Sequence, residues 1–395
     1  MIKAISAFTN PGIMRWARKT SRMSIDDVAR KIQKSPEVIE AWENGDDKPT
    51  INQLRALSNL YKRPLSVFYL PKPPEDFQTI RDFRKLPKGY SKEFSSDLAF
   101  LIRDTQSKQV WVRDHLISEN YEKLTFIGKG QISDSTKTLS SEIRKELGLS
   151  IADQMESKDC DRAFRLLMDR VEEKGIFVFR QLGIDSREVR GFVLCDDYAP
   201  FIFINAEDSA AGQLFTLAHE LVHLWINQSG ISNNEPFKEA KTKEEGIERF
   251  CNQVASEFLV PDEVFNKFVK NLGTVNSNEE AINDISKIFK VSREVIARKF
   301  LNKGIINFQD YEGLREKYIK EWQKFKELRK KKLKEKESTA FVYYPLTLNA
   351  NGIAFTRMAL SAYYSRQLSG RDVSGLLGVK INNLGKLAAY AKYKK

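Results

Sequence analysis

The feature that most constrains this chain is the placement of its histidines. Only three occur in 395 residues, and two of them form the pattern His219-Glu220-Leu221-Val222-His223 inside an apolar run. Residues four apart lie one turn from each other on the same helix face, so both imidazoles can reach one metal ion. Glu220 flanks that face, where it can accept a proton from an attacking water. The spacing predicts a buried helix with two metal ligands and a general base, and the alternative is a pair of histidines that only cap a buried helix.

Two histidines do not complete such a centre, because catalytic zinc sites hold three protein ligands. No further histidine follows, so a carboxylate must serve, and the candidates are Glu235, Glu239, Glu244, Glu245 and Glu248. Glu248 shares a helical stripe with Asn252 and Ala255 and adjoins an apolar stripe, so it faces the interior and needs a partner there. Asn252, one turn later, is placed to hydrogen-bond a ligand. This pattern favours Glu248, since Glu244 and Glu245 suit the start of a helix.

Two separated segments resemble motifs of the ImmA/IrrE metallo-endopeptidase family. They are residues 215–223 (Phe-Thr-Leu-Ala-His-Glu-Leu-Val-His) and 248–255 (Glu-Arg-Phe-Cys-Asn-Gln-Val-Ala), the second followed by Phe258-Leu259-Val260-Pro261. The family's second motif reads E-x-x-A-N-x-F-A, from which Cys251 and Val254 depart as apolar replacements. The resemblance covers roughly residues 76–306.

This resemblance implies a gluzincin-like zinc site. His219, His223 and Glu248 would be the ligands, Glu220 the general base and Asn252 a supporting residue. The donor set suits Zn²⁺, although Mn²⁺ or Fe²⁺ could also occupy it. The strand at 201–204 would line the cleft and hold a peptide by strand addition.

Residues 13–70 also resemble a known unit, the XRE-type helix-turn-helix. The matching segments are 24–29 and 35–45, followed by Lys48-Pro49-Thr50 and 54–68. The resemblance implies that the helix at about 35–43 enters the major groove. The candidate DNA-contacting residues are Arg15, Arg18, Lys19, Arg22, Lys34, Ser35 and Lys48.

Charge leaves the partner of this unit open. The helix at 35–43 carries Glu37, Glu40 and Glu43 and no Lys or Arg, and acidic groups repel phosphates. Residues 13–71 as a whole hold eleven basic and seven acidic side chains, which favours phosphate binding. DNA is therefore the expected partner, with a protein as the alternative.

The remaining pattern predicts an α+β chain with an all-helical N-terminal domain and a mostly helical C-terminal region. Short apolar runs predict strands at 176–179, 191–194 and 201–204, and the helical periodicity predicts helices at 95–118, 211–228, 243–258 and 262–271. The Pro-rich link at 71–74 marks a boundary. We expect a helix-turn-helix domain at 1–71, a peptidase domain at 72–270, a helical extension at 271–310 and a basic and helical region at 311–395.

The net charge of +12 is concentrated in one stretch. Residues 315–336 hold eleven Lys or Arg and four Glu, which predicts either a solvated helix or linker, or a surface for nucleic acid or an acidic partner. Residues 282–306 and 373–387 each show helix-turn-helix rhythm, and either could be a plain helical hairpin.

Composition excludes several classes of protein. No run approaches the ~18 apolar residues of a spanning helix, and the N-terminus lacks a signal-peptide core. Three scattered cysteines exclude a disulfide scaffold, so we expect a cytoplasmic protein without a membrane partner. The expected function is a zinc endopeptidase that cleaves a regulatory protein, a repressor with its own helix-turn-helix or a toxin or antitoxin partner. The alternative is a DNA-binding regulator, antitoxin-like, whose metal site is structural, silent or triggered.

Overall fold

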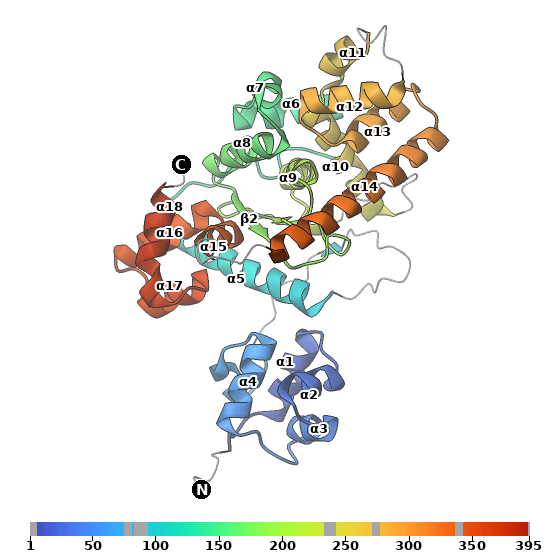
Figure 1. Cartoon of the computed structure of the whole chain (residues 1–395). Helices are drawn as coiled ribbons and strands as arrows, with labels where there is room; N and C mark the ends of the chain where they lie inside the picture. Colours follow the sequence, from blue (N-terminus) through green and yellow to red (C-terminus); the bar gives the residue numbers. More distant parts are fainter. Residues whose placement is uncertain are drawn as a thin grey trace. The chain divides into compact units, whose positions relative to one another are not determined.

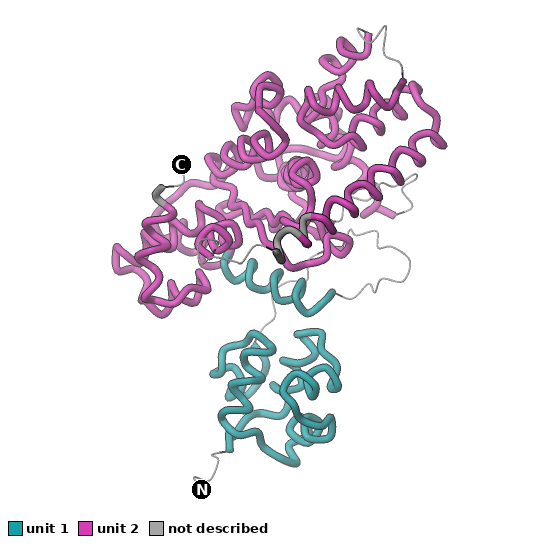
Figure 2. The backbone as a smooth tube through the Cα atoms, in the orientation of Figure 1, with its two compact units in different colours: residues 1–79, 86–108 teal, residues 80–85, 109–395 magenta. Residues whose placement is uncertain are grey.

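The computed structural model has an α+β fold, mostly helical, with a five-stranded mixed sheet in the middle of the chain. It describes residues 6–74, 81–82, 94–232, 242–270, 277–335 and 343–393. The chain divides into two compact units, residues 1–79 with 86–108 and residues 80–85 with 109–395 (Figure 2). The expected fold class is confirmed.

The first unit contains a bundle of short helices. They are α1 (Pro11–Thr20), α2 (Ile25–Ile32), α3 (Pro36–Asn44), α4 (Ile51–Tyr61) and the 3₁₀ turn η1 (Leu65–Tyr69). Side chains of Asn10, Ser24 and Thr50 cap α1, α2 and α4, which satisfies amide groups that a helix start leaves unpaired. Trp42 and Tyr61 lie in the centre of a small core that these helices share.

The sheet of the second unit has the order β1-β5-β3-β4-β2. Its strands are β1 (Arg81–Asp82), β2 (Phe177–Gln181), β3 (Gly191–Leu194), β4 (Phe201–Asn205) and β5 (Gly230–Ser232). β3 runs antiparallel to β4 and β5, and β2 runs parallel to β4. The three strands expected from the sequence are present, whereas β1 and β5 were missed because each is too short to show a period.

The position of β4 corrects one expectation. Both of its edges are already paired, to β2 with Phe203 opposite Phe179 and to β3 with Phe203 opposite Phe192. Strand addition needs an unpaired edge, so the interior strand β4 cannot hold a peptide in that way. The expectation that residues 201–204 hold a peptide by strand addition was therefore wrong, and their place along the cleft stays a prediction.

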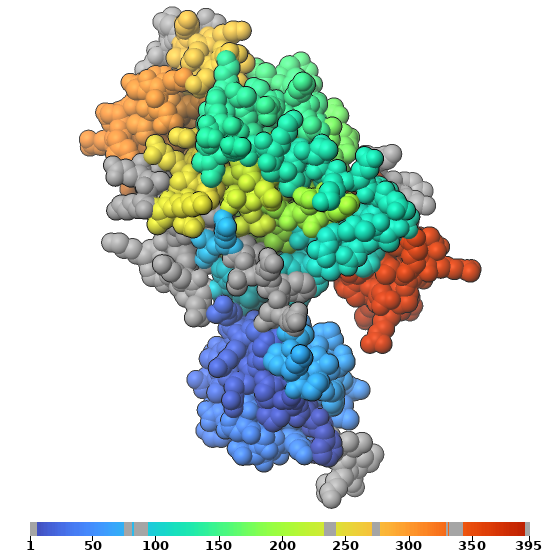
Figure 3. All heavy atoms as spheres, turned by 180° about the vertical axis from the view of Figure 1, so that it is seen from behind, coloured from blue at the N-terminus to red at the C-terminus, as the bar shows by residue number. Residues whose placement is uncertain are grey.

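The first helices of this unit pack on or near the sheet, and all but the first of them supply or pack against the main core. They are α5 (Ser96–Ser118), which enters this unit at residue 109, α6 (Thr136–Leu147), α7 (Ile151–Glu156), α8 (Cys160–Glu173), α9 (Ala210–Trp225), α10 (Lys243–Leu259) and α11 (Asp262–Lys270). α9 packs against β3, β4, α8 and α10 (Figure 1). Seen from behind, the green surface of α6 and α7 adjoins the yellow surface of α10 (Figure 3). This packing leaves α9 almost wholly buried.

The C-terminal third is helical throughout its described part. Its helices are α12 (Asn278–Phe289), α13 (Arg293–Asn302), α14 (Phe308–Glu335), α15 (Tyr343–Asn351), α16 (Ile353–Tyr364), α17 (Gly370–Leu377), η3 (Ile381–Asn383) and α18 (Leu384–Tyr393). Ile282, Phe289 and Phe300 of α12 and α13 belong to the main core, so residues 282–306 pack as a helical hairpin of the second unit.

The basic stretch forms the long helix α14. Lys317 pairs with Glu279, and Lys326 lies 3.4 Å from Glu207, so part of its charge is met by acidic neighbours. The side chains of Arg329, Lys330, Lys332 and Lys334, and all of Lys336, lie outside the described residues. Within the described part of the chain, no helix combines the length and apolarity needed to cross a membrane.

Candidate metal centre

The helix α9 presents the two histidines because of how it begins and what covers it. The Ser209 hydroxyl accepts a hydrogen bond from the Gly212 amide and so caps the helix, and every residue from Thr216 to Trp225 is buried. His219 and His223 lie one turn apart on the same side, and their Nε2 atoms are 3.1 Å from each other. The predicted helix is confirmed, although it ends at Trp225 rather than at residue 228.

The third member of the group comes from α10, which packs against α9. Thr242 caps α10, and Glu248 lies in its second turn with only 1% of its surface exposed. Glu248 Oε1 is 3.0 Å from His223 Nε2, and Glu248 Oε2 is 3.3 Å from His219 Nε2. The expected trio of His219, His223 and Glu248 therefore comes together, with one ligand atom from each within 4.8 Å of the others.

The other glutamates considered as ligands lie elsewhere. Glu244 and Glu245 are in the first turn of α10, where a carboxylate is favoured by the helix dipole, and Glu244 is exposed. Glu235 and Glu239 lie outside the described residues. Asn252 lies one turn after Glu248 and lines a cavity, and its support of a ligand stays a prediction.

The geometry of the three donors fits a tetrahedral metal ion. Bonds of about 2.0–2.1 Å from zinc to nitrogen or oxygen place neighbouring ligand atoms roughly 3.3 Å apart. The two histidine nitrogens are 3.1 Å apart, and each lies 3.0 or 3.3 Å from a different oxygen of the Glu248 carboxylate, which is close to that value. Burial raises the pKa of Glu248, but the charge and hydrogen bonds of the two histidines outweigh burial and hold the pKa at about 2. The carboxylate is thus ready to act as an anionic ligand.

Glu220 lies beside this group and is held by a residue that the motif does not contain. The Ser232 hydroxyl on β5 donates a 2.6 Å hydrogen bond to Glu220 Oε1. Glu220 Oε2 is buried and has no hydrogen-bond partner among the described residues. Burial raises the pKa of Glu220 to about 8, and the charge of Glu248 adds to this rise, whereas His223 and the Ser232 hydrogen bond oppose it. One oxygen is therefore oriented while the other is available.

A glycine makes room for that carboxylate. A Cβ atom on Gly191 of β3 would lie 2.8 Å from Glu220 Oε1 and 2.5 Å from Thr216 Cγ2. The strand can approach α9 this closely only because residue 191 has no side chain. Neither Ser232 nor Gly191 could be recognised from the sequence, since their roles come from strand pairing far along the chain.

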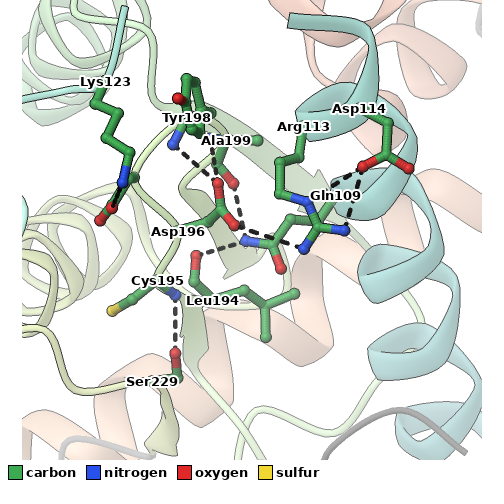
Figure 4. A network of polar contacts seen from close by, with 11 residues as sticks. Gln109, Arg113, Asp114, Lys123, Leu194, Cys195, Asp196, Tyr198, Ala199 and Ser229 are labelled. Carbon is green, nitrogen blue, oxygen red and sulfur yellow. Dashed lines mark hydrogen bonds and ion pairs between the residues drawn. The ribbon is translucent and has the colours of Figure 1, made fainter. Parts of the chain in front are cut away.

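A polar network fixes the turn behind the centre (Figure 4). The Gln109 amide donates to the carbonyls of Leu194 and Ala199 at 2.9 and 2.8 Å, which ties α5 to both ends of the β3–β4 turn. The Cys195 amide donates to the Ser229 hydroxyl, and Cys195 Sγ is 3.7 Å from the His223 carbonyl oxygen. Burial raises the pKa of the Cys195 thiol to about 12, so it is a neutral packing group here.

In the first unit, the structure separates the candidate DNA contacts into two groups. Arg18 makes two hydrogen bonds, 2.7 and 2.8 Å long, to the carboxylate of Glu43, which is only 4% exposed. Arg15 hydrogen-bonds the Glu43 carbonyl and the Asn44 side chain. Arg15 is nevertheless exposed, and so are Lys19, Arg22, Lys34, Ser35 and Lys48. Because Glu43 points inward to Arg18, the acidic charge on α3 that argued against DNA is smaller than the sequence indicated.

Comparison with known proteins identifies both regions. Residues 171–301 match the IrrE N-terminal-like domain of the M78 peptidases, and residues 14–68 match a helix-turn-helix domain. No curated protein matches the chain. A solved structure, described as a Mycobacterium tuberculosis transcriptional regulator, is 16% identical over 49% of this chain, with a TM-score of 0.28. The match spans about half of that structure, 51%.

The matched domain contains all of the residues that converge on the centre. His219, Glu220, Ser232 and Glu248 lie within 171–301, and the short helices α1 to α4 lie within or overlap 14–68. The chain therefore carries an IrrE N-terminal-like peptidase domain with a buried His219–His223–Glu248 candidate metal site, joined to an N-terminal XRE-type helix-turn-helix domain.

Proposed function

We propose that this protein is a metal-dependent endopeptidase that cleaves a regulatory protein, and that its helix-turn-helix binds DNA. The observation that carries the proposal is the carboxylate of Glu220. It is wholly buried beside a three-donor group, with one oxygen oriented by Ser232 and the other without a partner among the described residues. A metal site that only stabilises the fold does not require a buried carboxylate beside its ligands.

The donor set supports zinc as the metal, with His219, His223 and Glu248 as its ligands. When bound, zinc would polarise the carbonyl of the scissile bond and make a water more acidic. Manganese and iron also bind imidazole and carboxylate ligands, but zinc is the metal that this donor set favours.

Glu220 supplies the proton transfers. Burial raises the pKa of Glu220, and the charge of a bound metal would lower it again, so that the carboxylate can take a proton from water and return it to the leaving amine. Ser232 keeps Oε1 fixed, so Oε2 is the oxygen that faces the reaction. Because Glu220 is buried, the low dielectric constant around it strengthens its electrostatic interactions.

The helix-turn-helix domain supports a regulatory target rather than broad digestion. Such domains bind DNA through the second helix of the helix-turn-helix motif, which is α3 in this chain. Ser35 at its N-cap and the exposed Lys19, Arg22, Lys34 and Lys48 are the proposed contacts. The substrate would be a repressor or a toxin or antitoxin partner that acts at the same DNA.

One observation favours a second candidate function, a DNA-binding regulator with a structural metal site. His219, His223 and Glu248 are each 1% exposed or less, and structural zinc sites are closed. Such sites usually hold four protein ligands, whereas three are found among the described residues. A set of three donors rather than four favours the enzyme.

Variants of the centre test the proposal in purified protein. Glu220→Gln should retain metal and lose cleavage of co-expressed regulators, whereas His223→Ala should lose both. His115→Ala is the matched control, because His115 stacks on Trp111, is not part of the three-donor group and should retain both properties. Full cleavage by Glu220→Gln would contradict the mechanism.

DNA binding is tested separately by gel shift. Arg22→Ala should weaken binding to DNA from the promoter of the chain's own gene, and Arg55→Ala, an exposed arginine outside the proposed contacts, should not. The absence of a shift with any fragment at low salt would favour a protein partner for this domain.

A further inference from the structure

A cavity of about 470 Å³ opens in the second unit beside the two helices that carry the metal ligands. α9 contributes Phe215, α10 contributes Arg249 and Asn252, and α13 contributes Arg298. Its volume falls in the range of natural ligand sites, about 300–1,000 Å³. The proposed mechanism uses none of the side chains in this cavity.

The lining is positively charged. Three arginines, Arg190, Arg249 and Arg298, face a single carboxylate, Glu294. The Tyr311 hydroxyl donates a 3.1 Å hydrogen bond to Glu294, and Arg315 lies 3.6 Å from it, so other groups already satisfy that carboxylate. The net charge of the lining therefore favours an anion.

Arg249 is the arginine that is most available to a ligand. Among the described residues it has no hydrogen bond or ion pair, whereas Arg190 lies 3.8 Å from Asp208 and Arg298 hydrogen-bonds the Tyr311 hydroxyl. Asn252, Gln253 and Ser256 line the same wall of α10 and add neutral hydrogen-bonding groups. A planar guanidinium with neighbouring amide donors matches the two oxygens of a carboxylate.

The cavity is lined by residues one helical turn from two of the metal ligands. Phe215 precedes His219 by one turn of α9, and Asn252 follows Glu248 by one turn of α10; the rings of Phe215 and His219 are 6.5 Å apart. One helical turn is about 5.4 Å, and an extended peptide advances about 3.3 Å per residue. A peptide whose scissile bond lies at the metal ligands would thus place a residue one or two positions away in this cavity.

We propose that this cavity is a subsite for an acidic side chain, aspartate or glutamate, one or two residues from the cleaved bond, with Arg249 as the main specificity residue. The inference rests on the proposed peptidase function, which it deepens by naming the substrate class. The carboxylate of the substrate would pair with Arg249 and accept hydrogen bonds from Asn252 or Gln253.

Cleavage specificity is the first test. The full-length protein with zinc is incubated with a mixture of proteome-derived peptides, and the new ends are identified by mass spectrometry. Aspartate and glutamate should be enriched within two residues of the cleaved bond, Arg249→Gln should abolish the enrichment, and Arg162→Gln, an exposed arginine on α8, should leave it unchanged. Cleavage without acidic enrichment overturns the subsite and leaves the peptidase function intact.

Binding is the second test and does not depend on turnover. The Glu220→Gln protein is titrated calorimetrically with two blocked pentapeptides that differ only in a central glutamate or glutamine, and with inorganic phosphate. The glutamate peptide should bind roughly tenfold more tightly or better, the value of a charge-assisted hydrogen bond, and Arg249→Gln should remove the difference.

The two tests separate the possible failures. If the wild-type protein cuts no peptide but the glutamate peptide binds selectively, the peptidase function fails and the acidic-peptide site stands. Equal binding of the two peptides overturns the site. Phosphate binding that depends on Arg249, without discrimination between the peptides, overturns it as well and assigns the cavity to a free anion.

Discussion

Gly191→Ala tests whether the close approach of β3 to α9 is needed to hold Glu220. The added methyl group would lie 2.5 Å from Thr216 Cγ2, 2.8 Å from Glu220 Oε1 and 3.0 Å from the carbonyl oxygen of Phe203. Carbon atoms in ordinary contact are about 3.5–4.0 Å apart, so the Thr216 methyl group must retreat by about 1 Å. The strand carbonyl cannot yield, because β3 and β4 are paired through it. The side chains on α9 must therefore move.

The cost follows from that displacement. Overpacking a well-filled core costs about 1–3 kcal/mol of unfolding free energy. A shift of about 1 Å in a catalytic group reduces turnover by roughly 100-fold. The three atoms nearest the new methyl group belong to Thr216, Glu220 and Phe203 and to none of the metal ligands, so metal affinity should change less than turnover.

The assay combines three measurements on one protein preparation: urea unfolding, metal content and cleavage. Gly246→Ala is the matched control, since it adds the same methyl group on α10 where nothing lies within 4 Å. The control should be as stable as the wild type or up to about 1 kcal/mol more stable, because alanine favours a helix. Unchanged stability and full cleavage by Gly191→Ala would refute the assigned role of this glycine.

Three further predictions concern other contacts. Ser232→Ala removes the hydrogen bond that lowers the pKa of Glu220, so this pKa should rise. Cleavage at neutral pH should therefore fall about tenfold, with metal content unchanged. A pH–rate profile identical to that of the wild type would contradict this. Burial raises the pKa of Glu172 to about 7, so the stability that this group contributes is full below pH 4.5 and is lost as pH rises through 7. In urea unfolding at pH 8, Glu172→Gln should therefore be more stable than the wild type by up to roughly 3 kcal/mol. Equal stability of the two proteins at pH 8 would contradict the raised pKa. Arg18→Met should destabilise the first unit by roughly 3 kcal/mol, because it leaves the Glu43 carboxylate buried and unpaired. Thermal unfolding of the first unit measures this loss. An unchanged transition would show that the pair contributes little.

The metal ligands could be found from the sequence because helix geometry is local. The four-residue spacing of the histidines and the inward stripe of Glu248 depend on the 3.6-residue period alone. The helix boundaries followed the same pattern, and α5 and α10 begin and end within one residue of the expected positions.

What the sequence did not reveal depends on strand order and on distant packing. Ser232 reaches Glu220 because β5 pairs with β3, and no local pattern encodes that pairing. The interior place of β4 has the same origin, which is why strand addition there was a wrong expectation. Arg18 and Glu43 are 25 residues apart, so their pairing could not be read from the charge of α3 alone. The boundaries at 71, 270 and 310 stay predictions.

Endopeptidase activity can be tested in host cells by comparing new protein N-termini between cells that express the wild type and cells that express Glu220→Gln. An endopeptidase with Glu220 as its base should produce a small set of N-termini that appear only with the wild type and that lie in a regulatory protein. Identical profiles in both cells, at rest and under stress, would contradict the endopeptidase and favour a regulator whose metal site is structural.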